Sequence, residues 1–247
     1  MQLVTWNLNG LEDRYLDERT EAAMFNILLG APIEKAIQEG FSPNTPDIIV
    51  LQEVVHRTFH AHITPHLQAA CFNLYPTEPS ERSYFEVVAT RLPITESNYT
   101  PFEYSDQGRG LTTFNVKDHT TEVQVMTAHL ESMKPSASMR IDQSEVILRQ
   151  MNESKIPCIF AGDTNLRKKE WQSLAANKVK DAWEIIGSPK NYKSTWFSDN
   201  RKARYDRVWT SQIDVKKFAL FGGNKIPSIK EPSSDHHAIR VDFEIKN

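Results

Sequence analysis

Cysteine is scarce in this sequence. Its 247 residues include two cysteines, Cys71 and Cys158, and each has apolar neighbours. Two cysteines in such surroundings argue against a disulfide framework and against a cysteine-based zinc site. We therefore expect a protein of a reducing compartment, the cytoplasm or, in a eukaryotic cell, the nucleus.

Long apolar runs and a signal peptide are missing as well. No stretch approaches the roughly 18 apolar residues of a membrane span. Residues 2–8, "QLVTWNL", follow a strand-like pattern where a signal peptide would have a basic region and an apolar run. We expect a soluble protein without a membrane partner. The net charge of −3 argues against bulk electrostatic coating of nucleic acid and leaves room for a local basic groove.

Repeats, low-complexity segments and Gly/Ser-rich linkers are also absent, so we expect a single domain over residues 1–247. Apolar, β-branched runs predict strands at 3–8, 47–54, 84–90, 111–116, 123–129, 157–163, 203–210 and 238–244. Helical patterns cover 17–40, 55–71 and 138–153. Several strands follow one another without a helix, which disfavours a barrel or a doubly wound sheet. The pattern favours an α/β (α+β) protein, a two-sheet β-sandwich flanked by helices on both outer faces.

Polar side chains stand where several predicted strands end. These residues are Asn7, Glu53, His129, Asp163 and Asn165. Because side chains alternate along a strand, each strand-end residue should continue an inward-facing row, as Glu53 would continue the row of Ile49 and Leu51. Taken together, such residues are what an oxygen-rich metal and phosphate site on the rim of a sandwich requires.

Each of these residues also has a structural explanation when it is taken alone. Asn7 would start a turn, Glu53 would cap a helix, and Asp163 would form an Asx-turn. Two later segments favour the functional interpretation, because they place Asp206 between two arginines and Asp235 and His236 before the last strand. A carboxylate beside an imidazole fixes its tautomer and keeps the ring protonated against an anionic substrate. His237 is expected to point elsewhere.

Six short motifs occur in order along the chain: "TWNLNG", "LQEV", "AHLES", "GDTNLR", "YDR" and "SDHH". Together they resemble the endonuclease/exonuclease/phosphatase superfamily, which implies a four-layer deoxyribonuclease-I-like fold. "TAHLES" and "FAGDTNLR" are similar to the 5′-tyrosyl-DNA phosphodiesterase family, whereas abasic-site endonucleases have "GDFN". "DER" at 17–19, "YF" at 84–85 and "STW" at 194–196 also match short motifs of that family. The chain departs from the family in having "SDHHA" for "SDHWG" and in lacking an N-terminal ubiquitin-binding extension, which predicts a minimal catalytic domain.

The resemblance implies a role for each strand-end residue. Glu53 would be the direct ligand of Mg²⁺, with Mn²⁺ as a substitute, and Asn7 and Asp235 would lie nearby. Asp163 would take a proton from the attacking water, and Asn165 would orient that water. His236, held by Asp206, would donate to a phosphate oxygen. Asn7 and His129 complete the predicted catalytic set.

A second group of residues is expected to bind the substrate. It comprises Ser132 on a phosphate oxygen, Arg109 on the DNA backbone, Arg167 near the site, Trp196 as a stacking platform, Arg204 within the basic run 201–207, and Tyr84. The alternatives are a surface arginine at 167, a core tryptophan at 196 and a solvated loop for the basic run. Four histidines spaced i, i+4 between 56 and 66 suggest a zinc site, but no "HExxH" motif or nearby cysteine accompanies them, so solvent-facing or capping histidines are favoured.

The leading hypothesis is a magnesium-dependent hydrolase of DNA repair. It would remove a tyrosine or peptide left by a trapped topoisomerase from a DNA 5′ end, leave a 5′-phosphate, and act as a monomer. A tyrosine phenolate has a pKa near 10 and departs without a strong general acid, which agrees with the residue set. One alternative is an abasic-site endonuclease or another phosphodiesterase acting on RNA, lipid or inositol phosphates, and a second is an inactive DNA-binding module.

Overall fold

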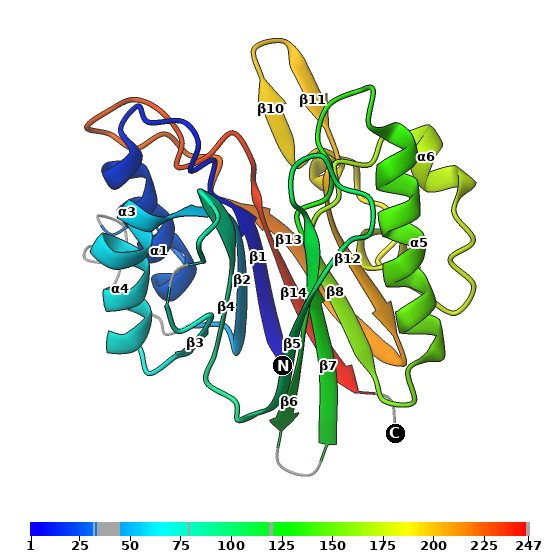
Figure 1. The fold of residues 1–247 in the computed structure, drawn as a ribbon. Coiled ribbons are helices and arrows are strands. Elements are labelled where there is room, and N and C mark those ends of the chain that lie inside the picture. Colours follow the sequence, from blue (N-terminus) through cyan, green and yellow to red (C-terminus); the bar gives the residue numbers. More distant parts are fainter. Residues whose placement is uncertain (32, 34–44, 79, 119–120, 246–247) are drawn as a thin grey trace. The chain divides into compact units, whose positions relative to one another are not determined.

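The structure, a computed structural model, describes residues 1–31, 33, 45–78, 80–118 and 121–245. The described strands form two six-stranded sheets and a two-stranded ribbon (Figure 1). The first sheet contains β1 (Gln2–Asn7), β2 (Ile48–Val55), β3 (Asn73–Tyr75), β4 (Tyr84–Thr90), β13 (Ile213–Phe221) and β14 (Ala238–Ile245), in the order β13-β14-β1-β2-β4-β3. The second contains β5 (Ile94–Pro101), β6 (Gly110–Asp118), β7 (Thr121–Thr127), β8 (Cys158–Asp163), β9 (Lys180–Asp181) and β12 (Asp206–Ser211), in the order β5-β6-β7-β8-β12-β9. The ribbon pairs β10 (Trp196–Ser198) with β11 (Arg201–Ala203).

The chain divides into two compact units. The first comprises Met1–Arg91 and Leu220–Arg240, and the second comprises Leu92–Ala219 and Val241–Asn247. The expectation of a single domain stays a prediction. Among the residues that the structure describes, no helix has the length and apolar character needed to cross a membrane.

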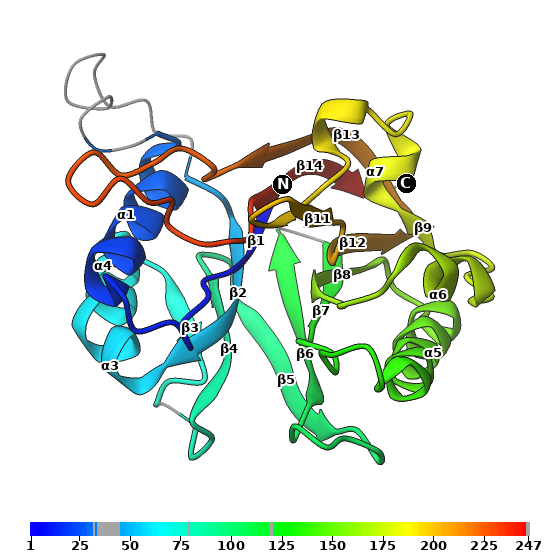
Figure 2. The same cartoon turned by 90° about the horizontal axis from the view of Figure 1, so that it is seen from above.

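In the first unit, parallel strands β1 and β2 are joined through helix α1 (Leu16–Leu29). Alternate residues of these strands, such as Trp6 and Leu51, are fully buried in a core that also contains Met24 of α1 and Phe59. Burial of a side chain of this size contributes roughly 1.5–3 kcal/mol. Helix α1 and the consecutive segments α3 (His56–Thr58), η1 (Phe59–Ile63) and α4 (Thr64–Ala69) cover this face of the strands (Figures 1 and 2). The other face of β1 and β2 also carries buried apolar side chains, such as Leu3 and Val50, and the polar strand-end residue Asn7 continues the row of Leu3.

In the second unit, β5, β6 and β7 form an antiparallel meander, and β8 runs parallel to β7 after the crossover helix α5 (Ala137–Glu153). Met126, Phe160 and Trp209 pack on one face of the sheet against Ile147 and Met151 of α5. The short helices α6 (Lys168–Ser173), α7 (Ala182–Ile185) and η2 (Lys190–Tyr192) follow β8, and α6 lies beside α5 (Figures 1 and 2). Here too, one face of the strands is occupied by helices.

The sequence pattern predicts most of these elements and misses two long strands. The strand at 84–90 and the helix at 138–153 are confirmed to within a residue, and the helical pattern at 55–71 is confirmed as α3, η1 and α4. Strand β5 is not predicted because "ITESNYTP" is mostly polar and exposed at the edge of its sheet. Strand β13 is not predicted because consecutive lysines interrupt its apolar alternation. The predicted helix at 17–40 ends at Leu29, where Gly30 adopts a left-handed C-cap, and residues 32 and 34–40 of that prediction lie outside the described residues.

Candidate active site

Three polar side chains come from neighbouring strands of the second unit. Asp206 at the start of β12 is the register partner of Asp163 at the end of β8, and His129, just after β7, bridges to Asp163 from the other side. Each of the three is at most 2% exposed. Ala128, next to His129, and Phe160, three residues before Asp163, pack in the core beside α5, so His129 and Asp163 occupy the opposite face of the sheet. The face predicted for these two residues is confirmed.

The Asp163 carboxylate contacts two donor groups. Its Oδ1 accepts the backbone N–H of Asn165 at 2.9 Å, and its Oδ2 lies 3.3 Å from Nε2 of His129. Asn165 adopts a left-handed conformation with φ 51° and donates its Nδ2 to the carbonyl of Leu130 at 3.2 Å. The Asx-turn that the sequence alone allows at Asp163 is present. The same turn brings Asn165 to the carboxylate, so Asp163 both forms the Asx-turn and belongs to the candidate active site.

Arg109 determines which nitrogen of His129 carries the proton. Its Nη1 lies 2.9 Å from Nδ1 of His129. Because a guanidinium has only donors, Nδ1 must be the acceptor, and the ring proton then resides on Nε2, facing Asp163. Arg109 is 2% exposed, and its guanidinium faces the histidine; its expected contact with a DNA backbone stays a prediction.

Replacing Arg109 by methionine should lower kcat about ten- to a hundredfold, the range found when the partner that orients a histidine is removed. Without the guanidinium, the ring proton of His129 can move to Nδ1, and the lone pair of Nε2 would then face the Asp163 carboxylate in place of an N–H donor. Arg109→Lys, which keeps a cationic donor, should restore part of the activity, and imidazole ¹⁵N shifts report the tautomer. An unchanged tautomer in Arg109→Met would contradict this role.

The loop that carries Arg109 is anchored on Glu131, which is 1% exposed. The Glu131 carboxylate accepts the hydroxyl of Ser105 at 2.5 Å and the backbone N–H of Gln107 at 3.0 Å. The side chain of Gln107 in turn exchanges hydrogen bonds with the hydroxyl of Ser132 and accepts its backbone N–H. Ser132, expected to bind a phosphate oxygen, therefore also holds the loop in place.

Arg140 of α5 fixes the segment that follows His129. This side chain is fully buried, and its Nη1 donates to the carbonyls of Glu131, Ser132 and Met133. Its Nη2 donates to Glu170 at 2.9 Å, which ties the same segment to the first turn of α6. Nothing in the local sequence distinguishes Arg140 from a surface arginine, so sequence reasoning misses this residue.

Two threonines set the position of Asp206. Thr164, in the middle of "GDTN", donates its backbone N–H and its hydroxyl to the carbonyl of Tyr205 at 3.0 and 2.6 Å. The hydroxyl of Thr195 accepts the backbone N–H groups of Tyr205 and Asp206 at 3.1 and 3.0 Å. The threonines of "GDTN" and "STW" thus connect the end of β8 to the start of β12, where the carboxylate of Asp206 begins the strand.

In the first unit, Glu53 occupies a β-bulge in β2. The register with β4 shifts between Leu51 and Val54, and Glu53 has a left-handed φ of 53°. Leu51 and Val54 both belong to the core under the helices, so the alternation breaks between them and Glu53 turns to the opposite face. The prediction that Glu53 continues the row of Ile49 and Leu51 is wrong, because the bulge redirects its side chain toward Asn7.

Asn7 is held on several sides. Its Nδ2 donates to Oε1 of Glu53 at 3.2 Å, and its Oδ1 accepts the backbone N–H of Asn9 at 2.9 Å. Its carbonyl accepts the hydroxyl of Ser234 at 2.7 Å. A Cβ on Gly10 would collide with the Glu53 carbonyl, so the loop after β1 can approach the bulge only with glycine there. The predicted turn after Asn7 is present, and it orients the carboxamide toward Glu53.

Arg19 of α1 organises the loops of the first unit. The side chain is 3% exposed, and its guanidinium donates to backbone carbonyls of Leu8, Asn9, Glu12, Arg14 and Ser233. Burial lowers the pKa of Arg19, and four carboxylates oppose that shift: Glu12, Asp235, Glu231 and Glu53. The sequence alone indicates Arg19 only as part of the "DER" motif and predicts no role for it.

Glu231 is paired with Arg14 at 2.8 Å, but the four carboxylates around Arg19 still outnumber the two arginines. Glu53 and Asp235, the two predicted carboxylate ligands of a metal, are both among them. With the carboxamide of Asn7 on Glu53, the donor set consists of hard oxygen atoms, the type that Mg²⁺ and Mn²⁺ prefer. The residues present therefore fit a divalent cation.

His236 is fixed through its backbone. Its carbonyl accepts Nε1–H of Trp6 at 2.8 Å, and its N–H donates to the hydroxyl of Ser234 at 3.0 Å. The imidazole is nearly buried, with Nε2 4.0 Å from Oδ1 of Asp235. The expected contact of His236 with Asp206 stays a prediction.

His237, the residue that departs from the family pattern, packs with its ring against Gly223. Burial, and then the neighbouring His236, lower the pKa of His237. A neutral imidazole is the consistent state for a ring in that environment. The expectation that His237 has a separate environment agrees with this position.

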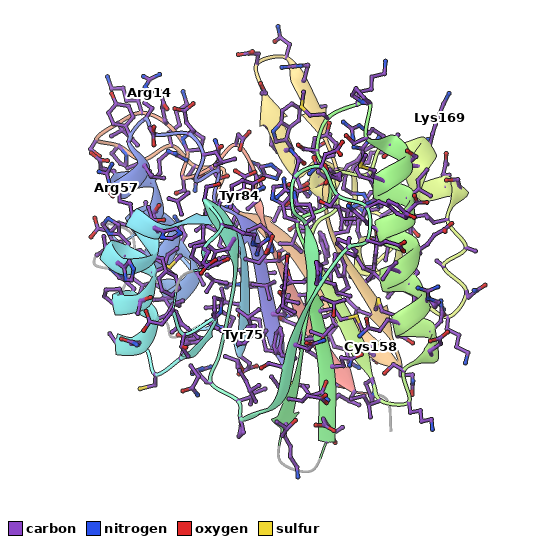
Figure 3. All side chains as sticks on the ribbon, viewed as in Figure 1. Arg14, Arg57, Tyr75, Tyr84, Cys158 and Lys169 are labelled. Carbon is purple, nitrogen blue, oxygen red and sulfur yellow. The ribbon has the colours of Figure 1, made fainter. Side chains whose placement is uncertain are left out.

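The remaining substrate-binding candidates are partly exposed. Trp196 on β10 is only partly buried, and its ring lies 5.4 Å from that of Tyr205, centroid to centroid. Arg167 donates to the carbonyl of Asn165 at 2.9 Å, which brings it to the turn after β8. Tyr84 is the first residue of β4, in the first unit (Figure 3). Arg204 pairs with a carboxylate of its own unit, as described below.

The histidines of α3, η1 and α4 make local contacts. Nε2 of His62 lies 3.3 Å from Oδ1 of Asp17, and Nδ1 of His66 bonds to the carbonyl of His62 at 2.7 Å. Nε2 of His56 bonds to the carbonyl of Arg82 at 3.0 Å. In the part of the chain that the structure describes, these histidines do not join a group of three metal-ligating side chains.

Two units that present buried carboxylates, imidazoles and oxygen donors at strand ends are typical of phosphate-ester chemistry. The family model described as "Endonuclease/Exonuclease/phosphatase family" matches residues 4–236, so the chain belongs to that family. Within it, the chain groups with the tyrosyl-DNA phosphodiesterases. It is 28% identical to "Tyrosyl-DNA phosphodiesterase 2" of Homo sapiens and 30% identical to "5′-tyrosyl-DNA phosphodiesterase" of Caenorhabditis elegans, over 98% of this chain in each case.

The chain spans 68% of the human relative and 67% of the nematode relative. Among solved structures, TDP2 of D. rerio complexed with single-strand DNA product superposes with a TM-score of 0.82 at 24% identity, over 99% of this chain and 98% of that one. These comparisons confirm the predicted family and the deoxyribonuclease-I-like fold class.

Proposed function

We propose that this chain is a 5′-tyrosyl-DNA phosphodiesterase. It hydrolyses the bond between a DNA 5′-phosphate and a tyrosine or peptide left by a trapped topoisomerase, and it leaves a 5′-phosphate for DNA repair. One observation carries the proposal: the "GDTN" turn presents Asp163 with His129 and Asn165 on it, in a chain whose similarity to proteins of that name extends over 98% of its length. The relation to the endonuclease/exonuclease/phosphatase family supports hydrolysis of phosphodiester bonds as the reaction class.

Asp163 serves as the general base of this reaction. The Nε2–H of His129 and the backbone N–H of Asn165 orient its two oxygens, so that the carboxylate is preorganised before a water arrives. The Nδ2 of Asn165 is turned to the Leu130 carbonyl, which leaves Oδ1 of Asn165 as the acceptor that orients the attacking water. Arg109 acts behind them by fixing the tautomer of His129.

Glu53, with Asn7 and Asp235 nearby, would hold a divalent cation, Mg²⁺ with Mn²⁺ as a substitute. Such a cation would supply neutralisation of the phosphate oxygens and polarisation of phosphorus. Asn7 keeps the Glu53 carboxylate in position, and Arg19 holds the loops that carry Asn7 and Asp235. The excess of carboxylates around Arg19 supports a cation in this unit.

His236 donates a hydrogen bond to a phosphate oxygen as charge builds. The backbone bonds of His236 to Trp6 and Ser234 support such a fixed donor. The leaving tyrosine departs as a phenolate, whose pKa near 10 makes a strong general acid unnecessary. The residue set contains no dedicated acid, which agrees with that leaving group.

The substrate can be established with a panel of oligonucleotides. The chain is expected to release tyrosine from a 5′-phosphotyrosyl oligonucleotide in Mg²⁺, to leave an abasic duplex intact, and to stop in EDTA. Cleavage of the abasic duplex alone would contradict the tyrosyl specificity in favour of the abasic-site endonuclease. DNA binding without cleavage of either substrate would identify an inactive binding module.

We also propose a reducing compartment for the protein, the cytoplasm or, in a eukaryotic cell, the nucleus. Cys71 and Cys158 are both free thiols, and Cys71 is exposed. An exposed thiol is compatible with glutathione-rich surroundings.

A further inference from the structure

A second site of the second unit is lined by aromatic rings and cations. The cavity has a volume of about 550 Å³, within the range of small-molecule sites. Its aromatic lining is Trp171, Trp183 and Tyr205, and its cationic lining is Arg167, Lys168, Lys193, Lys202, Arg204 and Arg207. Glu184 is the one acidic residue of the lining. Such a composition suits an anionic ligand with a planar group.

This cavity, named here the aromatic pocket, lies on the other face of the sheet from Asp163 and Asp206. Arg207 follows Asp206 in β12 and so points to the opposite face. The ring of Trp171 stacks on that of Trp209 at 5.2 Å between centroids, and Trp209 belongs to the core beside α5. The aromatic pocket is thus separate from the row of catalytic candidates in the same unit.

The positive charge in the aromatic pocket is only partly neutralised. Arg204 and Arg207 share one oxygen, Oδ2 of Asp181, at 2.6 and 3.0 Å. The other oxygen of Asp181 caps α7 by accepting the N–H of Trp183 at 3.0 Å. Burial, and then Arg204, lower the pKa of Arg207 to about 10 although Asp181 opposes the shift. Glu184 is a second partner of Arg204, with its Oε1 3.8 Å from Nη2, so the surplus positive charge of the pocket comes from its three lysines and Arg167.

A buried donor also lacks a partner there. Arg207 is 3% exposed, and its Nε has no hydrogen-bond partner in the described part of the chain. A buried N–H without a partner is costly, so a ligand oxygen that accepts from it gains the full value of the bond. Arg207 already donates from Nη1 to Asp181. Its Nε–H is a second charged donor, which a phosphate oxygen can accept.

We infer that the aromatic pocket binds a nucleotide, with its phosphate at Arg207 and Arg204 and its base against the aromatic rings. A phosphate accounts for the surplus charge and the unpartnered Nε. Arg207 and Trp209 already lie over the ring of Trp171, at 5.0 and 5.2 Å, so the base is placed against Trp183, whose ring has Arg204 over it at 4.5 Å, and against Tyr205. The nucleotide is either a unit of a nucleic-acid strand or a free mononucleotide. This site goes beyond the proposed reaction, and its binding can be measured in EDTA, where no cleavage occurs.

The test compares two double variants in full-length protein by quenching of tryptophan fluorescence. Lys168→Glu with Lys202→Glu reverses two exposed charges of the aromatic pocket. The control, Lys169→Glu with Lys155→Glu, reverses two exposed lysines outside its lining, and Lys169 extends from α6 beside Lys168 (Figure 3). A 5′-mononucleotide should bind the wild type and the control equally and bind the pocket variant about tenfold more weakly, as expected for two lost charge contacts.

Three further probes separate the possible ligands. A single-stranded oligonucleotide that binds far more tightly than the mononucleotide, with the same sensitivity to the pocket variant, would identify a strand as the source. Inorganic phosphate that binds as tightly as the mononucleotide would overturn the role of the base. An acidic peptide that binds while both nucleotides fail, or equal nucleotide affinity in the two double variants, would overturn the inference. Arg207→Lys, which keeps the charge near Asp181 and loses the Nε donor, should also weaken nucleotide binding.

Discussion

The Asp163→Asn variant is expected to lose turnover by about 10²- to 10⁴-fold, the range for removal of a general base. The carboxamide cannot take a proton from the attacking water. It also cannot accept from both of the donors that Asp163 serves, because one of its two heavy atoms is an NH₂ group. Because Arg109 keeps the ring proton of His129 on Nε2, this N–H would face the NH₂ group of the asparagine. The free energy of unfolding should therefore fall by about 1–3 kcal/mol.

Both effects can be measured on one preparation. Single-turnover cleavage of a 5′-phosphotyrosyl oligonucleotide gives the rate, and denaturant unfolding gives the stability. Asp142→Asn, an exposed aspartate on α5, makes the same chemical change away from the site and should alter neither quantity. Activity retained in Asp163→Asn at near wild-type level would remove Asp163 from the role of base.

The Glu53→Gln variant is expected to bind the divalent cation more weakly, so that it needs a higher metal concentration for activity. Loss of one ligand charge should lower activity about a hundredfold at limiting Mg²⁺, in line with the cost of disturbing a metal site. Higher Mg²⁺ or Mn²⁺ should restore part of the activity, because the oxygen of glutamine remains and Asn7 still contacts that position. Addition of EDTA should abolish turnover in the wild type.

A metal titration of activity provides the measurement. The exposed Glu21→Gln on α1 is a suitable control, since it removes the same charge from the same unit. An identical metal dependence in Glu53→Gln and the wild type would show that Glu53 is not a ligand. Loss of activity that no metal concentration repairs, together with a fall in stability, would indicate a structural role of the bulge instead.

The sequence places the strand-end residues of β7 and β8 correctly because alternation along these two strands is regular. His129 and Asp163 continue their rows without interruption, and the turn at Asp163 follows from its own side chain. The same argument fails for Glu53. A bulge shifts the register of β2 by one residue, and an alternating sequence pattern does not reveal where a left-handed residue interrupts a strand.

The contacts of buried arginines are the other feature that sequence reasoning misses. Arg19, Arg109 and Arg140 are each at most 3% exposed, and each is paired with carbonyls, a histidine or a carboxylate from distant segments. Arginine is rarely buried unless it is paired, and the partners appear only once the chain has folded. These three side chains hold the loops on which the candidate catalytic residues lie, so the positioning of the site depends on contacts that no local pattern contains.

The most direct test of the central claim is cleavage of a 5′-phosphotyrosyl oligonucleotide in water enriched in ¹⁸O, with both products analysed by mass spectrometry. If Asp163 activates water against phosphorus and the phenolate leaves, the oligonucleotide should carry a 5′-phosphate with one ¹⁸O atom, and the released tyrosine should carry none. Label in the tyrosine, or cleavage at another phosphodiester with the tyrosyl bond intact, would contradict the account.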